Sequence, residues 1–420
     1  MVAPKVTCSR ATPIFVILGK IDDALALSSN TFAILVLNGH RAYMLICVRL
    51  ISIGGSMADT VFILGAGASF EAGAPLMSTF LDKAEDLRRT GEVNDCAPEF
   101  DKVFSLIDTL QAVYAKSELD LNNIEALFGI LEMASTVNRL YGIPEDQIGS
   151  YRDALIMVIV KTLERSINYH FSGGDFSKPQ PTDSYRKFVE LIQFLSKNFH
   201  EDSSIITFNY DTGVDHALHY AGLNVQYCTN ANPGDGIRLL KLHGSTNWGA
   251  CSKCHSIITY DLPTFFSKHD SKVRDDGTYD KHLEVSTYLS EIYHCEEPLN
   301  PVPVIVPPTW NKNSYRGDLS NVWSAAAREL SEARNIYVFG YSLPESDPFF
   351  RYLFALGTLG SSRIRRFWVF DPDSNVRLRY EGLIGSGIRS RFQFFDRGFL
   401  SSVSSSGAMD YLTWLLNQGR

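Results

Sequence analysis

The chain has 420 residues, of which 45% are hydrophobic and 20% charged, and its formal net charge at pH 7 is −8. It is long enough to bury a large core, and because it is acidic and has no Lys- or Arg-rich run, we expect no direct nucleic-acid partner. Seven cysteines, an odd number scattered along the chain, fit a reducing cytoplasm better than a disulfide framework.

The first 56 residues differ in composition from the rest of the chain. They carry five basic and two acidic residues. Residues 32–53 are rich in apolar side chains, but His40, Arg41 and Arg49 interrupt them, and a charge near the centre of a membrane span costs about 2.5–3.5 kcal/mol. A membrane anchor is therefore the weaker alternative. We interpret residues 1–56 as an atypical extension and Met57 as the natural start, and we expect no contact with a membrane.

An apolar run at residues 61–64 leads directly into the sequence GAGAS at residues 65–69. Uncharged, β-forming residues predict a strand buried on both faces, and the two glycines permit a tight turn that approaches a pyrophosphate closely. The start of the following helix would offer N–H groups to the phosphates. Ser69 either donates a hydroxyl to a phosphate or caps this helix. A dehydrogenase fingerprint would need a third glycine at position 70, where Phe70 stands.

Helical spacing of apolar residues dominates the region between residues 80 and 200. Phe80, Ala84 and Leu87 are one example, and Ile124 and Leu127 belong to another. We expect a helical insertion at about residues 80–200.

Two further apolar runs end in polar side chains. Residues 204–208 precede Asn209 and Asp211, and residues 239–242 precede His243. In open parallel α/β sheets, ligands bind beyond the carboxyl ends of the strands. We therefore expect these three side chains and the GAGAS turn to converge on one crevice.

The blocks GAGAS, TFNYD at 207–211 and LHG at 242–244 resemble, in this order, the signature blocks of the sirtuin-like NAD-binding family. Residues 337–343 resemble the Gly-x-Ser strand end of that family, and residues 367–373 resemble the strand that ends at the adenosine. The resemblance implies an α/β fold with a Rossmann-like parallel sheet, of the sirtuin-like and deoxyhypusine synthase-like type. We expect this domain over residues 57–400, with a small degenerate ribbon module at about 245–300 and a C-terminal helix within 401–420.

The resemblance also implies roles for individual side chains. His243 would activate a hydroxyl of the nicotinamide ribose or the attacking water, which suits imidazole because its unperturbed pKa is about 6.5. Asn209 would hold the ribose or the water, or alternatively cap a turn. Asp211 would orient the nicotinamide carboxamide, or alternatively cap the helix that begins near Gly213. The residues expected to bind NAD are Gly65, Ala66, Gly67, Ser69, Gly73, Pro75, Gly340, Ser342 and Asp371.

Cys251 and Cys254 form a Cys-x-x-Cys pair after His243, where deacetylase-type members of the family begin a zinc ribbon. A tetrahedral zinc site needs four ligands, and no second Cys-x-x-Cys pair follows. Cys295 together with His255 or His294 could complete the set. We nevertheless favour a ribbon remnant held together by packing over bound zinc.

The sequence departs from the protein deacetylases at two places. After GAGAS it keeps Gly73 and Pro75 but lacks the arginine of that family, and residues 304–309 stand where a substrate peptide would pair. The pattern is closest to bacterial defence-type sirtuin-like proteins. We therefore predict a cytoplasmic NAD+ glycohydrolase that yields nicotinamide and ADP-ribose in antiviral defence, with a homo-oligomer, a partner ATPase or a sensor protein as candidate partners. The alternatives are an NAD-dependent protein deacylase and a non-catalytic NAD or ADP-ribose sensor.

Overall fold

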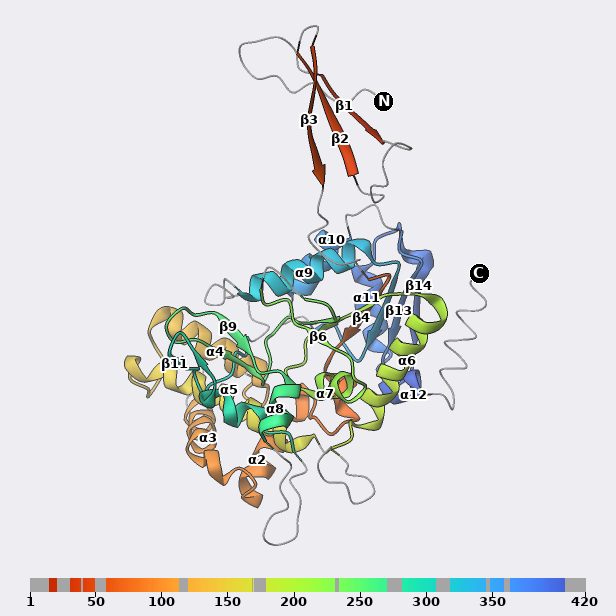
Figure 1. Cartoon of the computed structure of the whole chain (residues 1–420). Helices are drawn as coiled ribbons and strands as arrows, with labels where there is room; N and C mark the ends of the chain where they lie inside the picture. The colour runs from red at the N-terminus through yellow and green to blue at the C-terminus, as the bar shows by residue number, and fades with distance from the viewer. Residues whose placement is uncertain are drawn as a thin grey trace. The chain divides into compact units, whose positions relative to one another are not determined.

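The computed structural model describes residues 15–20, 31–38, 41–49, 58–112, 120–167, 169, 179–230, 234–269, 282–306, 318–344, 348–358 and 363–404. The chain divides into two compact units, Met1–Gly55 and Ser56–Arg420, whose elements are labelled in Figure 1. Met57, the predicted natural start, and residues 405–420, which hold most of the range of the predicted C-terminal helix, lie outside the described residues.

The first unit contains an antiparallel sheet. Strands β1 (Phe15–Lys20), β2 (Thr31–Asn38) and β3 (Arg41–Arg49) pair in that order. The alternative of a membrane-spanning helix within residues 32–53 is therefore wrong, because most of this segment forms β2 and β3. Among the described residues, none of the helices combines the length and the apolar character that crossing a bilayer requires.

The second unit is built on a seven-stranded sheet with the order β14-β13-β12-β4-β5-β7-β6, and all its neighbouring strands are parallel. Its central strand β4 is buried along its whole length, as uncharged β-forming residues predict. The predicted α/β fold with a Rossmann-like parallel sheet is confirmed. The strands are β4 (Thr60–Leu64), β5 (Ser203–Thr207), β6 (Val225–Gln226), β7 (Ile237–Lys241), β12 (Asn335–Phe339), β13 (Arg366–Phe370) and β14 (Phe392–Phe395).

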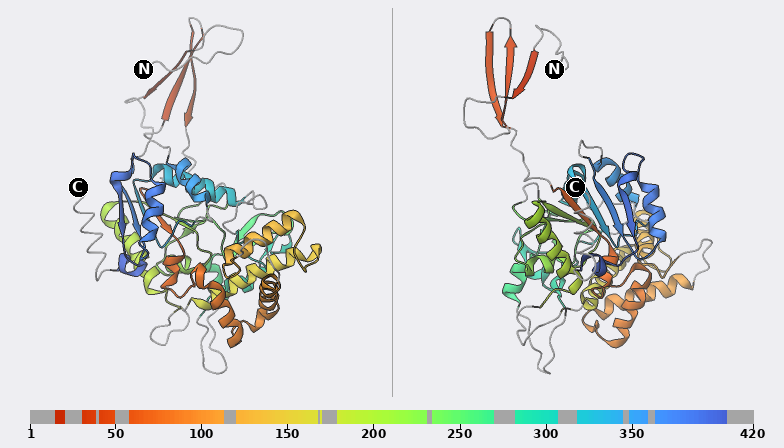
Figure 2. Two further views of the ribbon diagram at one scale, coloured as in Figure 1. Left: turned by 180° about the vertical axis from the view of Figure 1, so that it is seen from behind. Right: turned by 90° about the vertical axis from the view of Figure 1, so that its right-hand side faces the viewer.

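Between β4 and β5, the described residues form six α-helices. They are α1 (Ala66–Phe70), α2 (Phe80–Thr90), α3 (Ala97–Gln111), α4 (Ile124–Val137), α5 (Ile148–Ser166) and α6 (Asp183–Phe199). Helix α5 packs against α2, α3 and α4, and most of its side chains are buried. Figure 2 shows α2 to α5, coloured orange to yellow, grouped in a lobe beside the sheet.

The remaining helices cover the sheet and its ends. They are α7 (Gly213–Tyr220), α8 (Leu262–Lys268), α9 (Asp318–Glu332), α10 (Pro348–Gly357), α11 (Asn375–Leu383) and α12 (Phe399–Val403). Two small antiparallel pairs, β8 (Trp248–Ala250) with β9 (Ile257–Thr259) and β10 (Tyr293–His294) with β11 (Glu297–Pro298), lie in the region expected to form a ribbon. Short 3-10 helices are η1 (Met77–Thr79), η2 (Asn94–Cys96), η3 (Glu145–Gln147), η4 (Val285–Glu291) and η6 (Arg389–Arg391).

Candidate functional site

Two glycine turns meet at the carboxyl edge of the sheet, one after β4 and one after β12. The N–H of Gly67 donates to the carbonyl oxygen of Gly340 at 2.9 Å. A Cβ added to Gly67 would lie 2.7 Å from the Cα of Gly340, and Gly340 itself has a φ of +60°. Neither position tolerates a side chain, because the two turns touch backbone to backbone. The contact between the two turns therefore requires glycine at both positions, whether or not a nucleotide binds.

A cleft of about 980 Å³ opens beyond these turns. This volume lies near the upper end of the range for small-molecule sites, as a dinucleotide would need. Besides the sheet, the helical insertion contributes Asn123 and Glu125 at the start of α4, and Phe399 of α12 closes another side. The cleft brings together seven residues of the predicted site, which are Ala66, Gly67, Asn209, His243, Gly340, Ser342 and Asp371.

Five other residues of the predicted site do not line this cleft: Gly65, Ser69, Gly73, Pro75 and Asp211. Gly73 has a φ of +105°, and a Cβ on it would lie 2.5 Å from the carbonyl oxygen of Ser166, so the close approach of α5 explains this glycine. Pro75 is buried beside it. Their predicted contacts with NAD stay predictions.

His243 follows β7 directly and is only 4% exposed, yet it lines the cleft. Its ring meets Phe208 edge to face, with 5.3 Å between the centroids, and Phe208 in turn stacks on Tyr341 at 3.9 Å. The chain can turn away after His243 because Gly244 has a φ of +85°. The imidazole is therefore held by aromatic packing at the same edge of the sheet as the glycine turns.

Asn209, which follows β5, is fixed by its amide nitrogen. Nδ2 donates to the carbonyl oxygen of Gly65 at 2.8 Å and to the hydroxyl oxygen of Ser69 at 2.7 Å. A carbonyl oxygen only accepts, so the amide nitrogen must face Gly65. With both N–H groups engaged, the carbonyl oxygen is the group with which Asn209 can bind a ligand or a water.

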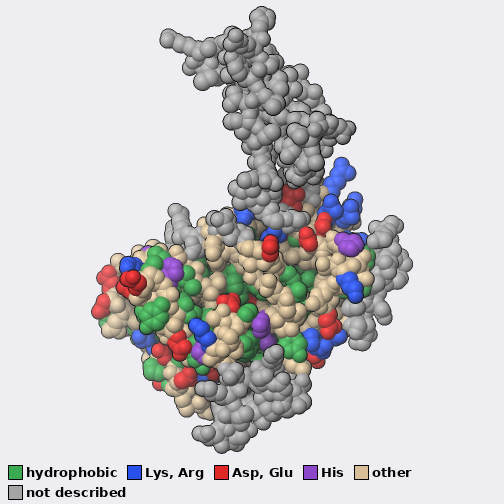
Figure 3. Space-filling view, viewed as in Figure 1, with side chains coloured by type: hydrophobic (Ala, Val, Ile, Leu, Met, Phe, Trp, Pro, Cys, Tyr) green, Lys and Arg blue, Asp and Glu red, His purple; other side chains and the backbone are tan. Residues whose placement is uncertain are grey.

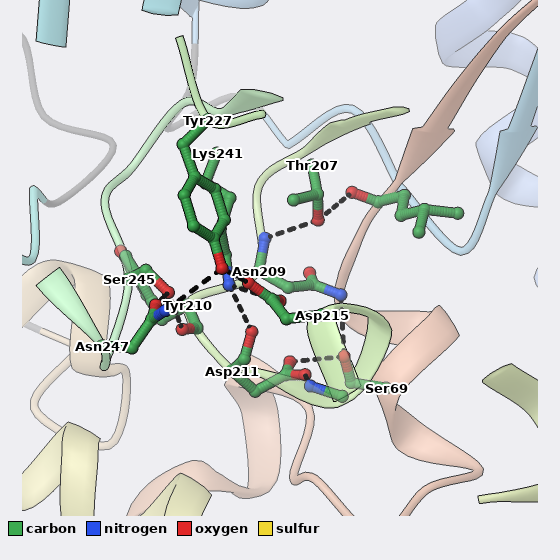
Figure 4. Close-up of polar contacts among 12 residues, drawn as sticks. Ser69, Thr207, Asn209, Tyr210, Asp211, Asp215, Tyr227, Lys241, Ser245 and Asn247 are labelled. Atoms are coloured by element: carbon green, nitrogen blue, oxygen red, sulfur yellow. Dashed lines mark hydrogen bonds and ion pairs between the residues drawn. The ribbon is translucent and has the colours of Figure 1, made fainter. Parts of the chain in front are cut away.

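Ser69 and Asp211 stand behind Asn209 in a buried network (Figure 4). The hydroxyl of Ser69 donates to Asp211 Oδ2 at 2.6 Å and lies 2.7 Å from the hydroxyl of Tyr185 on α6. Asp211 Oδ1 accepts from the N–H of Gly213 at 2.9 Å, which is the contact expected if Asp211 holds the start of α7. Burial raises the pKa of Asp211 and raises that of Tyr185 well above its ordinary value.

A buried ion pair supports the same strand ends. Lys241 is fully buried, and its ammonium donates to Asp215 Oδ2 at 2.9 Å and to the backbone carbonyl oxygen of Asp211 at 2.6 Å (Figure 4). Tyr227 donates to the other oxygen of Asp215 at 2.6 Å. Removing one partner would leave a buried charge, which costs about 3–5 kcal/mol. The sequence analysis missed these residues and Tyr185, because a lysine at a strand end and a tyrosine on an apolar helix face give no local signal of a shared network.

Among the described lining residues of the cleft, the charged side chains are mostly acidic. Five carboxylates line it, from Glu71, Asp120, Glu125, Asp371 and Asp373. Asp371 Oδ1 accepts from the N–H of Asp373 at 2.9 Å, and burial raises the pKa of Asp371.

Arg379 of α11 is the only Lys or Arg among the described lining residues. It donates to the backbone carbonyl oxygen of Ser342 at 3.0 Å, next to the turn after β12. A diphosphate in the cleft would therefore find one guanidinium close to the glycine turns. The sequence analysis did not single out this arginine.

A separate cluster in the ribbon region can hold a metal ion. The ligand atoms of Cys251, Cys254, His294 and Cys295 all lie within 4.8 Å of one another, and the Cys254 and Cys295 sulfurs are each 3.4 Å from His294 Nδ1. Three thiols and one imidazole fit tetrahedral zinc, whose bonds to sulfur are about 2.3 Å long. Of the two histidines that the sequence offers as a fourth ligand, His294 joins the cluster, and its convergence with Cys295 follows from the tight turn between β10 and β11, where Cys295 has a φ of +53°.

No protein-family model matches the sequence, and no curated protein matches it. Among solved structures, the chain is similar to a Sir2 homologue in complex with NAD, with 14% identity, a TM-score of 0.38, and coverage of 86% of this chain and 90% of that chain. The chain is also similar to a mutant Sir2 homologue in complex with ADP-ribose, with 13% identity, a TM-score of 0.38, and coverage of 86% of this chain and 93% of that chain. For a Sir2 complex with a p53 peptide and NAD+, the identity is 12%, the TM-score is 0.34, and the match covers 86% of this chain and 92% of that chain. These similarities are too low to transfer a residue role or an activity.

Proposed function

We propose that the chain binds NAD+ in this cleft and hydrolyses the bond between nicotinamide and ribose. One observation carries the proposal: His243 and Asn209 lie in the same cleft as the glycine turns after β4 and β12. The chain proceeds from β4 to β5 on one side of the sheet and from β12 to β13 on the other. The two turns therefore mark the reversal of strand order, which is where nucleotides bind in open α/β sheets.

In the proposed reaction, the C–N glycosidic bond breaks and its electron pair goes to the nicotinamide nitrogen. A water oxygen bonds to the anomeric carbon of the ribose, and the proton that the water loses passes to His243. Asn209 accepts a hydrogen bond from that water through its carbonyl oxygen, since its N–H groups are engaged by Gly65 and Ser69. The products are nicotinamide, ADP-ribose and a proton.

A protein deacylase would need room for an acyl-lysine peptide next to His243. Residues 304–306 occupy part of this neighbourhood. The N–H of Val306 donates to the carbonyl oxygen of His243 at 2.8 Å, the N–H of Ser245 donates to that of Val304 at 3.0 Å, and Ile305 is fully buried. The segment is thus paired with the His243 loop, which favours water over a peptide as the nucleophile.

A non-catalytic sensor of NAD or ADP-ribose is the second candidate function, and one observation favours it. Asn123 and Glu125 line the cleft and belong to the first turn of α4, with the Asn123 side chain accepting from the N–H of Glu125 at 2.9 Å. A bound ligand would therefore touch the helical insertion directly. Such contact could transmit occupancy of the cleft to a partner protein.

The biological role we propose is depletion of NAD+ during viral infection, which the resemblance to defence-type sirtuin-like proteins supports. An enzyme of this kind has to stay silent until it is triggered. A homo-oligomer, a partner ATPase or a sensor protein are the proposed means of control, and the cytoplasm, which holds NAD+, is the proposed compartment. Survival of infected cells that express the wild type or His243→Ala tests this role.

Nicotinamide release from NAD+ by the full chain tests the activity itself. Wild type, His243→Ala and Asn209→Ala are compared, each with and without an acetyl-lysine peptide. Release without peptide that both substitutions abolish supports the hydrolase. Release only with peptide establishes the deacylase instead, and NAD+ binding without release by the wild type favours the sensor.

A further inference from the structure

Arginines gather at the amino edge of the sheet, opposite the cleft. The three neighbouring strands β12, β13 and β14 each begin next to at least one of them. They come from three separate stretches of sequence and comprise Arg334, Arg363, Arg365, Arg366, Arg389 and Arg391. Figure 3 shows Lys and Arg side chains, in blue, gathered at the upper right of the described surface.

The strand register places these arginines in a row. Arg366 pairs with Asn335 of β12, and Phe367 pairs with Phe392 of β14, so Arg366 begins β13 and Arg391 directly precedes the neighbouring strand β14. The N–H of Arg365 donates to the backbone carbonyl oxygen of Arg334. Neighbouring strands lie about 4.8 Å apart, so the row spans about 10 Å across three strands.

Four of these arginines lack a carboxylate partner among the described residues. Arg363, Arg365, Arg389 and Arg391 are exposed, and none of them forms an ion pair within that part of the chain. Arg334, by contrast, pairs with Asp59 at 3.1 Å. In a chain of net charge −8, four unneutralised guanidinium groups in one place form a local positive surface.

The chemistry of this surface suits phosphate. Guanidinium groups bind phosphate oxygens in bidentate fashion and are weakly hydrated. The loop before β14 reads Gly-Ser-Gly-Ile-Arg-Ser-Arg at residues 385–391, and a Cβ added to Gly385 or Gly387 would meet nothing within 4 Å. A bulky, repeating anion can therefore approach the backbone of this loop as well as its arginines.

As far as the described residues extend, the surface lacks the apolar anchors that a protein partner would need. A protein interface usually has apolar anchors at its centre. None of the large exposed hydrophobic side chains in the described residues lies within 363–366 or 388–392. Binding to a phosphate backbone needs positive charge alone. Beyond β12 the same edge turns acidic, with Asp59, Asp202 and Asp235 before β4, β5 and β7, which confines a polyanion to the corner formed by β13 and β14.

We propose that this arginine edge binds the phosphate backbone of a nucleic acid, over about two or three phosphates. The sequence analysis expected no nucleic-acid partner because no basic run occurs. The fold supplies the basic surface by aligning the starts of separate strands. The binding is independent of base sequence and independent of the cleft, which lies at the other edge of the sheet.

Fluorescence anisotropy with a labelled 20-nucleotide single-stranded DNA tests the proposal on the full chain. Arg365→Ala/Arg391→Ala should weaken binding about tenfold or more at low salt. The slope of the logarithm of the binding constant against the logarithm of the salt concentration should become shallower by about 1.4, since each lost phosphate contact on a single strand contributes about 0.7. The matched control is Arg186→Ala/Arg377→Ala, which removes two arginines that are paired with carboxylates, Arg186 with Asp183 and Glu190 and Arg377 with Glu381. This control should bind like the wild type.

Three results would overturn the proposal: no binding by the wild type, an equal loss in the control pair, or an unchanged salt slope in Arg365→Ala/Arg391→Ala. Altered sedimentation of that variant with unchanged DNA binding would assign the edge to another protein chain. His243→Ala should keep full DNA binding, so the outcome does not depend on whether the cleft hydrolyses NAD+. Circular dichroism confirms that each variant is folded.

Discussion

The two edges of the central sheet are built in opposite ways. At the carboxyl edge, Ser69, Asp211 and Lys241 are almost completely buried and their hydrogen bonds to other parts of the chain fix the strand ends. At the amino edge, Arg365 and Arg391 are exposed and have no ion-pair partner within the described residues. The difference matches the two proposed functions, because bond cleavage needs fixed geometry whereas phosphate binding needs charge.

His243→Ala gives the largest expected effect and separates the two edges. Loss of the proposed base should lower nicotinamide release by about 10²–10⁴-fold. NAD+ binding should change little, because the glycine turns and Ser342 stay in place. Initial rates and calorimetric titration with NAD+ measure the two quantities. A variant that retains most of its activity would remove His243 from the mechanism.

A third region, the Cys/His cluster, sharpens the comparison because it belongs to neither edge. The purified chain should contain about one zinc ion, and Cys254→Ser should lose it along with several kcal/mol of stability, about 2–4. Metal analysis and urea unfolding test this expectation. Lys253→Ser, on a neighbouring exposed residue, is the control and should keep its metal. A wild-type protein without zinc would leave packing alone to hold the ribbon.

Gly67→Ala tests whether the contact between the two glycine turns at the carboxyl edge is needed for stability and for NAD+ binding. The new methyl group would meet Gly340 at 2.7 Å, and overpacking of this kind costs about 1–3 kcal/mol. We expect a lower midpoint in urea together with weaker NAD+ binding. Gly129→Ala on α4, where an added Cβ meets nothing within 4 Å, is the matched control and should be as stable as the wild type or more so.

Tyr185→Phe tests whether the buried network positions Asn209. Without the hydroxyl, Ser69 loses one of its three partners, which should cost about 1 kcal/mol of stability and about tenfold in kcat, with KM nearly unchanged. Tyr227→Phe is the control, because it removes a hydroxyl that donates to Asp215 in the neighbouring network. It should lower stability by a similar amount but leave Asn209, and therefore kcat, unchanged. Equal losses of kcat in both variants would contradict a positioning role for Tyr185.

The smallest expected effect concerns pH. Burial raises the pKa of Asp371, so the folded protein binds this proton more tightly than the unfolded chain does. Stability from this group is therefore lost as the pH rises from the ordinary aspartate value of about 4 through the higher pKa of the folded state. In Asp371→Asn, stability should fall less over that window, as urea midpoints at a series of pH values would show. A steeper fall would contradict the direction of the shift.

Local sequence patterns predicted the strands, the glycine turns and the convergence of Asn209 and His243 on one cleft. They did so because each feature depends on a few consecutive residues and on the rule that parallel strands end at the same edge. Tyr185 escaped notice because its partner Ser69 lies on a different element far along the chain. The sequence left open whether His255 or His294 joins Cys295, since a turn geometry decides this, and it missed the arginine edge, since strand register creates that edge.

The contact between Gly67 and Gly340 has a consequence for biosynthesis. Strand β4 leaves the ribosome long before its neighbour β12 and the turn at Gly340, which lie on the far side of Asn209 and His243 along the chain. A nascent chain that already carries Asn209 and His243 still lacks one wall of the cleft. If the cleft destroys NAD+ as proposed, the protein stays harmless to the cell that makes it until β12 and the turn at Gly340 have been made.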